Sequence, residues 1–242
     1  MSQKQDVLRE LYQEILPLQG YKAPAPGQPI DLGLGPLQAG FPNGVFPTGA
    51  MHDFITVDDE QLAATTAFLA GVLGQMMKSG GIAVWISPGG RTFAQGFAYY
   101  GVDPDRIIFV TPGTLKKALW VVDESLRCDR FIAVVAEIPD LSSFQSRRLQ
   151  LVVEQSRVTG FLVRHQPRQR SSVASIAQWR VTAHPTQSQG ARPGRGFPRW
   201  LVEVLRIRNR QPMACEVEWT GTRFHPIAMN EQAHIPNERK IG

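Results

Sequence analysis

The sequence lacks several features that would assign it to a common class. No apolar run reaches the roughly 18 residues that cross a bilayer, and the opening MSQKQDVLRE lacks the basic-then-apolar order of a secretory signal. Two cysteines, Cys128 and Cys215, are too few for a disulfide framework or metal cluster, and the five histidines show no metal-binding spacing. We therefore expect a compact, cytoplasmic protein with no membrane association, no metal and no cofactor.

Acidic residues are scarce in the last third of the chain. Residues 1–160 contain 13 Lys/Arg and 16 Asp/Glu, a net charge of −3, whereas residues 161–242 contain 13 and 5, a net charge of +8. Between Arg164 and Arg210 there are ten arginines and one acid, Glu203. Arginine of this density is typical of a surface for a polyanion or an acidic protein.

Proline, glycine and hydrophobic spacing divide the chain into four parts. Residues 1–20 predict a helix for self-association or partner binding, because Leu8, Leu11, Ile15 and Leu18 recur at helical intervals. Residues 21–49 are rich in proline and glycine and predict an extended linker. Residues 50–226 predict the folded core, and residues 227–242 a polar tail.

Strand-like and helix-like segments alternate through the core. The strands are apolar with little alternation, which indicates a mostly parallel sheet covered by helices on both faces. The predicted strands are 52–57, 82–87, 107–111, 131–136 and 161–164, and the predicted helices are 60–78, 92–100, 114–126, 142–158 and a brief one over 173–179. Residues 200–207 and 214–219 predict an added antiparallel hairpin, preceded by a loop over 185–199.

The turn after the first core strand lacks the residues that a phosphate-binding loop needs. A strand followed by a turn and a helix is the frame of a P-loop protein, whose signature needs glycines and a lysine. Here the turn runs from Thr56 through Asp58, Asp59 and Glu60 with neither. Three carboxylates suit a helix N-terminus, where Asp58 or Asp59 can cap the helix, but they repel a triphosphate. We therefore expect no ATPase activity.

Several segments resemble RecA-type proteins. FPNGVFPTGAMHDFI is similar to the segment before the RecA phosphate loop, and FAYYGVDPDRIIFVTPGT to a later RecA helix–turn–strand segment. QSRRLQLVVEQSRVTGFLVR, AQWRVTAHP and PRWLVEVLRIRNRQP…CEVEW are similar to ImuA, the RecA-like family of bacterial SOS mutagenesis cassettes. The resemblance covers roughly residues 1–222 and implies a RecA-like fold with an N-terminal helix and a C-terminal antiparallel hairpin.

The resemblance also locates a degenerate nucleotide site and two reduced DNA-binding loops. The Walker B aspartate falls on Ala136, with Glu137 next to it, and we expect Glu137 and Asp140 to cap the following helix. The loops correspond to residues 139–143 and 166–172. Arginines near the second loop and in the later glycine-rich loop are candidates for sequence-independent DNA binding: Arg164, Arg168, Arg170, Arg192, Arg195 and Arg199. For Trp179 we expect core packing.

The function that the resemblance implies is a non-catalytic accessory role in SOS-induced translesion synthesis. The implied partners are ImuB, an inactive relative of Y-family polymerases, and an error-prone replicative-type polymerase, with damaged DNA in the nucleoid as the place of action. One alternative is a SulA-like inhibitor of the cell-division GTPase, although the extra basic C-terminal portion argues against it. An ATP-dependent recombinase is the other. The missing lysine argues against it, as does the absence of RecA's catalytic glutamate from the corresponding residues 87–91.

Overall fold

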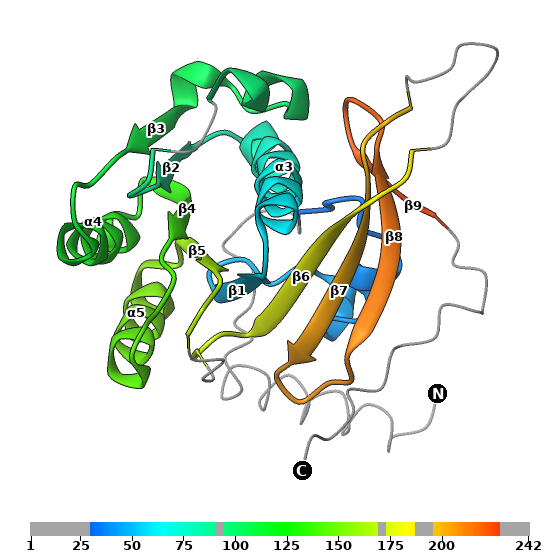
Figure 1. The fold of residues 1–242 in the computed structure, drawn as a ribbon. Helices are drawn as coiled ribbons and strands as arrows, with labels where there is room; N and C mark the ends of the chain where they lie inside the picture. Colours follow the sequence, from blue (N-terminus) through cyan, green and yellow to red (C-terminus); the bar gives the residue numbers. More distant parts are fainter. Residues whose placement is uncertain (1–29, 91–93, 169–172, 187–195, 228–242) are drawn as a thin grey trace.

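The computed structural model of the protein describes residues 30–90, 94–168, 173–186 and 196–227. Within these residues, nine strands form one mixed sheet in the order β3-β2-β4-β5-β1-β6-β7-β8-β9 (Figure 1). The predicted N-terminal helix with Leu8, Leu11, Ile15 and Leu18 lies outside the described residues, as does the predicted tail from residue 228 onward. No helix in the described part is long and apolar enough to cross a membrane.

Six strands form the parallel part of the sheet, and helices cover both of its faces. The parallel strands are β1 (Met51–Thr56), β2 (Ile82–Ile86), β3 (Ile107–Val110), β4 (Phe131–Glu137), β5 (Thr159–His165) and β6 (Ala177–His184). The helices are α3 (Asp59–Met76), α4 (Leu115–Arg127) and α5 (Ser143–Ser156), with 3-10 turns η2 (Met77–Ser79), η3 (Ala94–Tyr100) and η4 (Pro104–Arg106). The predicted α/β fold is therefore confirmed.

An antiparallel extension continues the sheet beyond β6. It consists of β7 (Arg199–Ile207), β8 (Met213–Trp219) and β9 (Phe224–Ile227), so the predicted hairpin is confirmed as β7–β8. The brief helix predicted over residues 173–179 is wrong, because β6 begins at Ala177. Residues of β6 alternate between buried and partly exposed from Ala177 to Thr182, which is the period of a half-buried strand.

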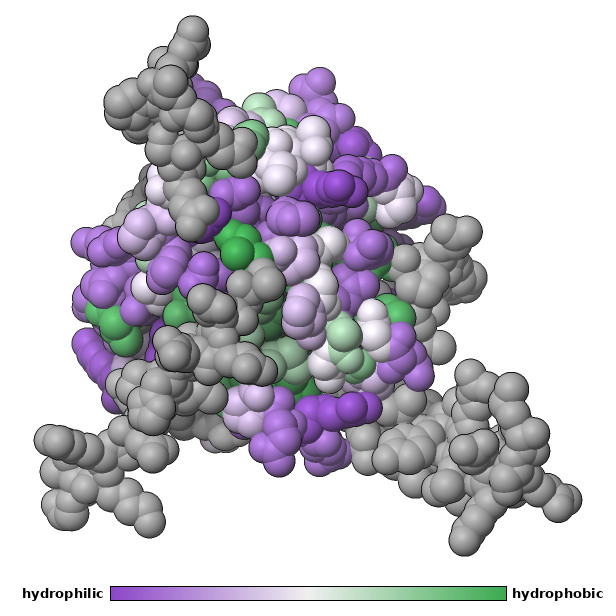
Figure 2. All heavy atoms as spheres, turned by 90° about the vertical axis from the view of Figure 1, so that its right-hand side faces the viewer, coloured by the Kyte–Doolittle hydropathy of each residue, from purple (hydrophilic) through white to green (hydrophobic). Residues whose placement is uncertain are grey.

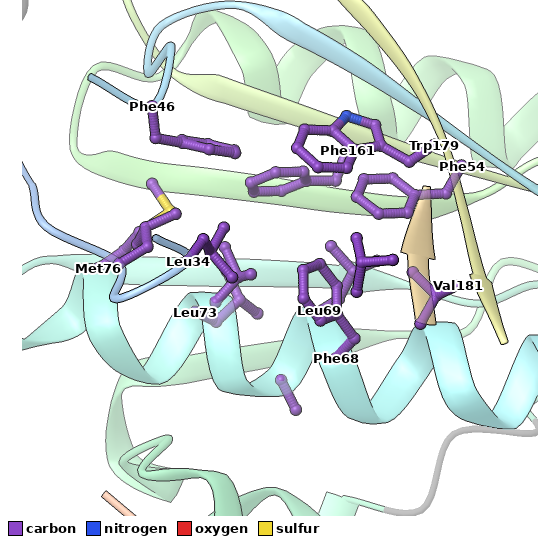
Figure 3. Packing of buried hydrophobic residues seen from close by; sticks show 14 of the residues in the cluster. Leu34, Phe46, Phe54, Phe68, Leu69, Leu73, Met76, Phe161, Trp179 and Val181 are labelled. Carbon is purple, nitrogen blue, oxygen red and sulfur yellow. The ribbon is translucent and has the colours of Figure 1, made fainter. Parts of the chain in front are cut away.

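Two hydrophobic layers lie on opposite faces of the sheet. The larger layer packs α3 against the strands, with Phe68, Leu69 and Leu73 facing Phe54 and Trp179 (Figure 3). The smaller layer lies beneath α4 and α5, which Figure 1 shows on the other side of the sheet from α3. Apolar area of this extent removed from water is the main stabilising contribution to the fold.

Helix α3 approaches its neighbours closely because of a glycine. A Cβ on Gly74 would lie 2.1 Å from the carbonyl oxygen of Tyr100, which is backbone and cannot swing aside. Gly74 is therefore required where α3 crosses the turn η3. The close approach lets α3 pack directly against η3.

Residues 30–49 differ from the extended linker that the sequence predicts. They contain α2 (Pro36–Ala39) and the turn η1 (Pro42–Gly44), and Figure 3 shows Leu34 and Phe46 within the larger layer. Five side chains of this segment are at most 2% exposed: Leu32, Leu34, Leu37, Phe41 and Phe46. Prolines and glycines break its regular structure, but its spaced leucines and phenylalanines anchor it to the core. Residues 21–29 lie outside the described part.

A neutral histidine lies in the centre of the larger layer. His52 is fully buried, and its ring stacks on Phe46 at a centroid distance of 4.6 Å. Trp179 Nε1 donates to His52 Nδ1 at 3.2 Å, so the proton of the neutral ring is on Nε2, which donates to the Pro47 carbonyl at 2.8 Å. Burial lowers the pKa of His52 from 6.5 to about 4, because desolvation penalises the charged ring.

We expect the unfolding free energy to decrease as the pH is lowered from 6.5 to 4, because of His52. The unfolded chain takes up a proton in this range and the folded chain resists it, so the stability contributed by neutral His52 is complete above pH 6.5 and is lost towards pH 4. The loss by pH 5 is roughly 2 kcal/mol. Urea unfolding at pH 7 and pH 5 measures it, with His52→Gln as the comparison.

Glutamine carries one acceptor and one donor group, as neutral His52 does, but does not titrate. Between pH 7 and pH 5 the wild-type protein should therefore lose about 2 kcal/mol more unfolding free energy than the His52→Gln variant loses. The other four histidines, His165, His184, His225 and His234, remain in both proteins and cancel from the comparison. Equal pH dependence in the two proteins would mean that His52 is not held neutral by the fold.

Candidate functional site at the carboxyl edge of the parallel strands

The turn from β1 into α3 contains two residues, Val57 and Asp58, and is closed by its own hydrogen bonds. Asp58 Oδ1 accepts from the backbone N–H of Gln61 at 2.7 Å, and Gln61 Oε1 accepts from the backbone N–H of Val57 at 3.2 Å. The predicted capping role of Asp58 is therefore confirmed. A backbone donor at the start of α3 is satisfied by a protein carboxylate rather than by an external anion.

Two further carboxylates, those of Asp59 and Glu60, lie in the first turn of α3. Both residues are exposed, and the side chain of Asp59 is 85% exposed. Negative charge at this end of a helix is stabilised by the helix dipole. The same charge makes the position unfavourable for a phosphate group, because no lysine or arginine occurs between Gly44 and Lys78 to compensate it.

His165 joins this site from the neighbouring strand. In the parallel pairing of β1 and β5, Thr56 lies beside His165, and Thr56 Oγ1 is 3.0 Å from His165 Nδ1. His165 Nε2 lies 3.4 Å from Asp59 Oδ1. The sequence prediction ended this strand at Arg164 and missed His165. The contact depends on β5 being next to β1, and no local pattern carries that information.

Glu137 lies at the end of β4, two strands away from Thr56. Its carboxylate accepts from Trp85 Nε1 at 2.9 Å and from Ser87 Oγ at 2.6 Å. The prediction that it caps the next helix is wrong, because Ser142 caps α5 in a reciprocal arrangement with Gln145. Ala136 is 1% exposed and belongs to the hydrophobic layer under α4 and α5.

The two loops that correspond to DNA-binding loops are short and connected to each other. Asp140, in the loop between β4 and α5, accepts from the backbone N–H of Arg168 at 3.0 Å. Asp140 therefore does not cap α5 as predicted. No group of three or more His, Cys, Asp or Glu side chains in the described ranges is arranged to hold a metal ion.

Arg164 does not contribute to a DNA-binding surface, so the prediction that it contacts DNA is wrong. Its side chain is 0% exposed, and its Nε and Nη2 atoms each lie 2.7 Å from an oxygen of Asp53, which is also 0% exposed. Gln178 Nε2 donates to the same carboxylate at 2.8 Å. Arg164 lies two residues after Leu162 on β5, so its side chain is on the face of the sheet that the smaller hydrophobic layer covers.

Most other arginines of the basic third that the structure describes also have internal partners. Arg199 begins β7 and pairs with Glu218 at 3.2 Å, with side chains 10% and 9% exposed, which contradicts its predicted place on a DNA-binding loop. Arg180 lies 3.6 Å from Glu203, and Arg206 donates to the Val173 carbonyl. Figure 2, seen from the β8–β9 side, shows hydrophilic and hydrophobic residues interspersed.

Arg168 is the DNA-binding candidate of the described part that is exposed. Arg170, Arg192 and Arg195 lie outside the described residues, so their predicted role stays a prediction. Trp179 is 0% exposed, which confirms the expected core packing.

Comparison with solved structures identifies the class of the fold. The crystal structure of the RadB recombinase matches 82% of this chain and 100% of its own, with a TM-score of 0.56 and 14% identity. A KaiC-like protein, PH0186, from Pyrococcus horikoshii OT3 matches 84% of this chain and 100% of its own, with a TM-score of 0.54 and 13% identity. The fold is therefore RecA-like, and at these identities the likeness concerns the fold alone.

Comparison of sequences finds relatives with higher identity than the structural neighbours have. No family model matches the chain. Protein ImuA of Caulobacter vibrioides, from strain NA1000 / CB15N and from strain ATCC 19089, is 29% identical over 229 residues, covering 88% of this chain and 92% of the relative. The chain is a homologue of ImuA, as the sequence resemblance predicted.

Replacing Arg164 should destabilise the protein strongly. Arg164→Ala leaves the buried carboxylate of Asp53 with Gln178 alone, and an uncompensated buried charge costs about 3–5 kcal/mol. Urea unfolding at pH 7 measures the change, and Arg164→Lys keeps the charge without the forked contact for the case in which the alanine variant does not fold. Arg168→Ala, at an exposed position, is the matched control and should change stability by less than about 0.5 kcal/mol. A similar, small effect at both positions would contradict the structural role of Arg164.

Proposed function

We propose that this protein is a non-catalytic, RecA-like accessory protein of damage-induced mutagenesis. In this role it acts as a scaffold that places an ImuB-type protein and an error-prone polymerase at damaged DNA. The observation that carries the non-catalytic part is the turn from β1 into α3, where Asp58 accepts the backbone N–H of Gln61 at 2.7 Å. The homology to protein ImuA supports the cellular role.

The closed turn argues against nucleotide binding on physical grounds. A phosphate held at a helix N-terminus needs backbone N–H groups that point towards it and a cation that offsets its charge. Here the capping carboxylate takes one of these donors, and Asp59 and Glu60 add negative charge in the first turn. Glu137, at the end of β4, accepts hydrogen bonds from Trp85 and Ser87.

We expect the protein to bind no ATP at micromolar concentrations and to hydrolyse none. Micromolar affinity needs about 8 kcal/mol of binding free energy, which is difficult to obtain where three carboxylates face a triphosphate. Isothermal titration calorimetry with ATP and magnesium measures binding, and ADP and a magnesium-free titration serve as controls. Saturable, magnesium-dependent binding with a micromolar Kd would contradict the proposal.

The scaffold role requires surfaces for partners, and the N-terminal segment remains one candidate. Leu8, Leu11, Ile15 and Leu18 predict a helix whose apolar face packs against another subunit, a partner or the core. Direct contact with DNA would rely on Arg168 together with Arg170, Arg192 and Arg195. Contacts of this kind neutralise phosphates without reading bases and are therefore strongly dependent on salt.

We expect deletion of the gene to abolish damage-induced mutagenesis while leaving cell division unchanged. A tagged copy should restore mutagenesis and recover the ImuB-type protein from damaged cells. The measurements are the mutation frequency after ultraviolet irradiation, the cell length, and the identity of the co-purified proteins. An untagged strain controls for non-specific recovery of proteins. A tagged chain lacking residues 1–20 tests whether the predicted N-terminal helix contributes to partner binding. Recovery of the cell-division GTPase, with shortened filaments in the deletion strain, would instead support the SulA-like alternative.

A further inference from the structure

The outer surface of α4 and α5 exposes large apolar side chains beside arginines. The two helices pack against each other on the same side of the sheet (Figure 1). On α5, Phe144 is 79% exposed and Leu151 is 47% exposed, and on α4 Trp120 is 65% exposed. We call the following residues the α4–α5 surface: Arg127, Phe144, Arg147, Arg148, Leu151, Val152 and Gln155.

This surface is hollowed into a groove. Phe144, Leu151 and Val152 contribute its apolar lining, Arg127 comes from the end of α4, and the volume is about 400 Å³. Phe144 and Leu151 are seven residues apart, so they lie on the same face of α5 with a separation of about 10 Å along the axis. Such a groove fits the apolar side chains of a helix at a similar spacing.

The rim of the groove carries positive charge. Arg127 and Arg148 share one carboxylate, that of buried Asp123, at 3.0 Å each. Arg147 donates to Gln150, which is neutral, at 3.2 Å. The charge of Glu124 also acts on Arg127, so three arginines face two carboxylates and the neutral Gln150. A net positive charge remains around the apolar floor, and the arginine side chains are substantially exposed to solvent.

From this combination we infer that the α4–α5 surface docks an acidic amphipathic helix of a partner protein. Leucine or aromatic side chains of the partner fill the groove between Phe144 and Leu151, and its carboxylates pair with Arg127, Arg147 and Arg148. Burial of the apolar lining supplies affinity, and the forked arginine contacts select acidic sequences. The inference builds on the proposed scaffold role, which needs a face for a partner.

Charge and shape favour this occupant over two others. A second copy that docked symmetrically through the same surface would place arginines opposite arginines, and like charges in an interface are unfavourable. A nucleic acid would satisfy the arginines, but its phosphates would leave the aliphatic lining of Leu151 and Val152 without an apolar partner.

A displayed library of random peptides of about 15 residues, roughly four helical turns, tests the inference on the full chain. We expect enrichment of peptides that combine leucine or aromatic residues at helical spacing with aspartate or glutamate. Fluorescence anisotropy then gives the Kd of an enriched peptide. Phe144→Ser and Arg147→Glu should each weaken binding about tenfold or more, and added salt should weaken it further.

Exposed positions away from the groove provide matched controls. Tyr99→Ser removes an aromatic side chain that is 51% exposed, and Arg210→Glu reverses an exposed charge in the β7–β8 loop, and neither should change the Kd. Enrichment of basic peptides, or equal binding by all variants, would overturn the inference. The inference would also be overturned if the protein bound single-stranded DNA, or formed a dimer in sedimentation, and Phe144→Ser abolished that binding or that dimer. If Phe144→Ser and Arg147→Glu abolish peptide binding but leave mutagenesis intact in cells, the α4–α5 surface is not the partner site. The proposed function would not be affected by that result.

Discussion

The buried carboxylate of Asp53 joins the two halves of the sheet. Asp53 lies on β1, accepts from Arg164 on β5 and from Gln178 on β6, and all three contacts are between 2.7 and 2.8 Å. Because an unpaired charge in this position would cost several kcal/mol, a shift of any of the three strands is strongly disfavoured. β1 also leads directly into α3, so the same contacts fix where the helix begins. The parallel part and the antiparallel extension therefore meet at a point of fixed register.

The distribution of charge along the sequence differs from the distribution of charge on the surface. The last third has a net charge of +8, yet Arg164, Arg199 and Arg180 pair with acids of the fold. The α4–α5 surface belongs to the first 160 residues, which have a net charge of −3. Acids in that part cap helices or are shared between arginines, as Asp58 and Asp123 are. The basic part of the sequence therefore predicted exposed cations only in part, because Arg168 and Arg210 are exposed whereas Arg164 and Arg199 are buried in ion pairs.

Features that depend on neighbouring residues could be predicted from the sequence. The strands of the parallel sheet are continuous apolar runs, and the helices between them have apolar spacing and caps such as Asp58, so the order of the elements was predicted correctly. The predicted helix over 92–100 differs, because the structure has the 3-10 turn η3 there. The acidic turn after β1 was likewise visible, because glycine and lysine are absent there. Family resemblance supplied the connection between these elements, and the comparisons confirmed the ImuA relationship and the RecA-like fold.

Features that depend on distant residues could not be predicted. Arg164 looks like part of a basic loop until β5 is placed beside β1, where Asp53 becomes its partner. His165 likewise acquires its contact with Thr56 from strand order. The prolines of residues 30–49 suggested a linker, although Leu34 and Phe46 are buried in the larger layer. In each example the local composition was correctly observed, but a tertiary contact determined the role.

Because Asp58 caps the start of α3, the stability of the fold does not depend on a ligand bound at the carboxyl ends of the parallel strands. A helix N-terminus that binds an anion must leave backbone N–H groups open in the free protein, whereas a capping carboxylate stabilises the helix by about 1 kcal/mol at all times. Here Asp58 caps α3, and the helix packs along the larger hydrophobic layer through Phe68, Leu69 and Leu73. The core therefore needs no ligand at this edge to order its central helix. Phe144 and Leu151 of α5 are exposed and contribute little to the core, so the partner contact inferred for the α4–α5 surface would not compete with the packing that orders the central helix.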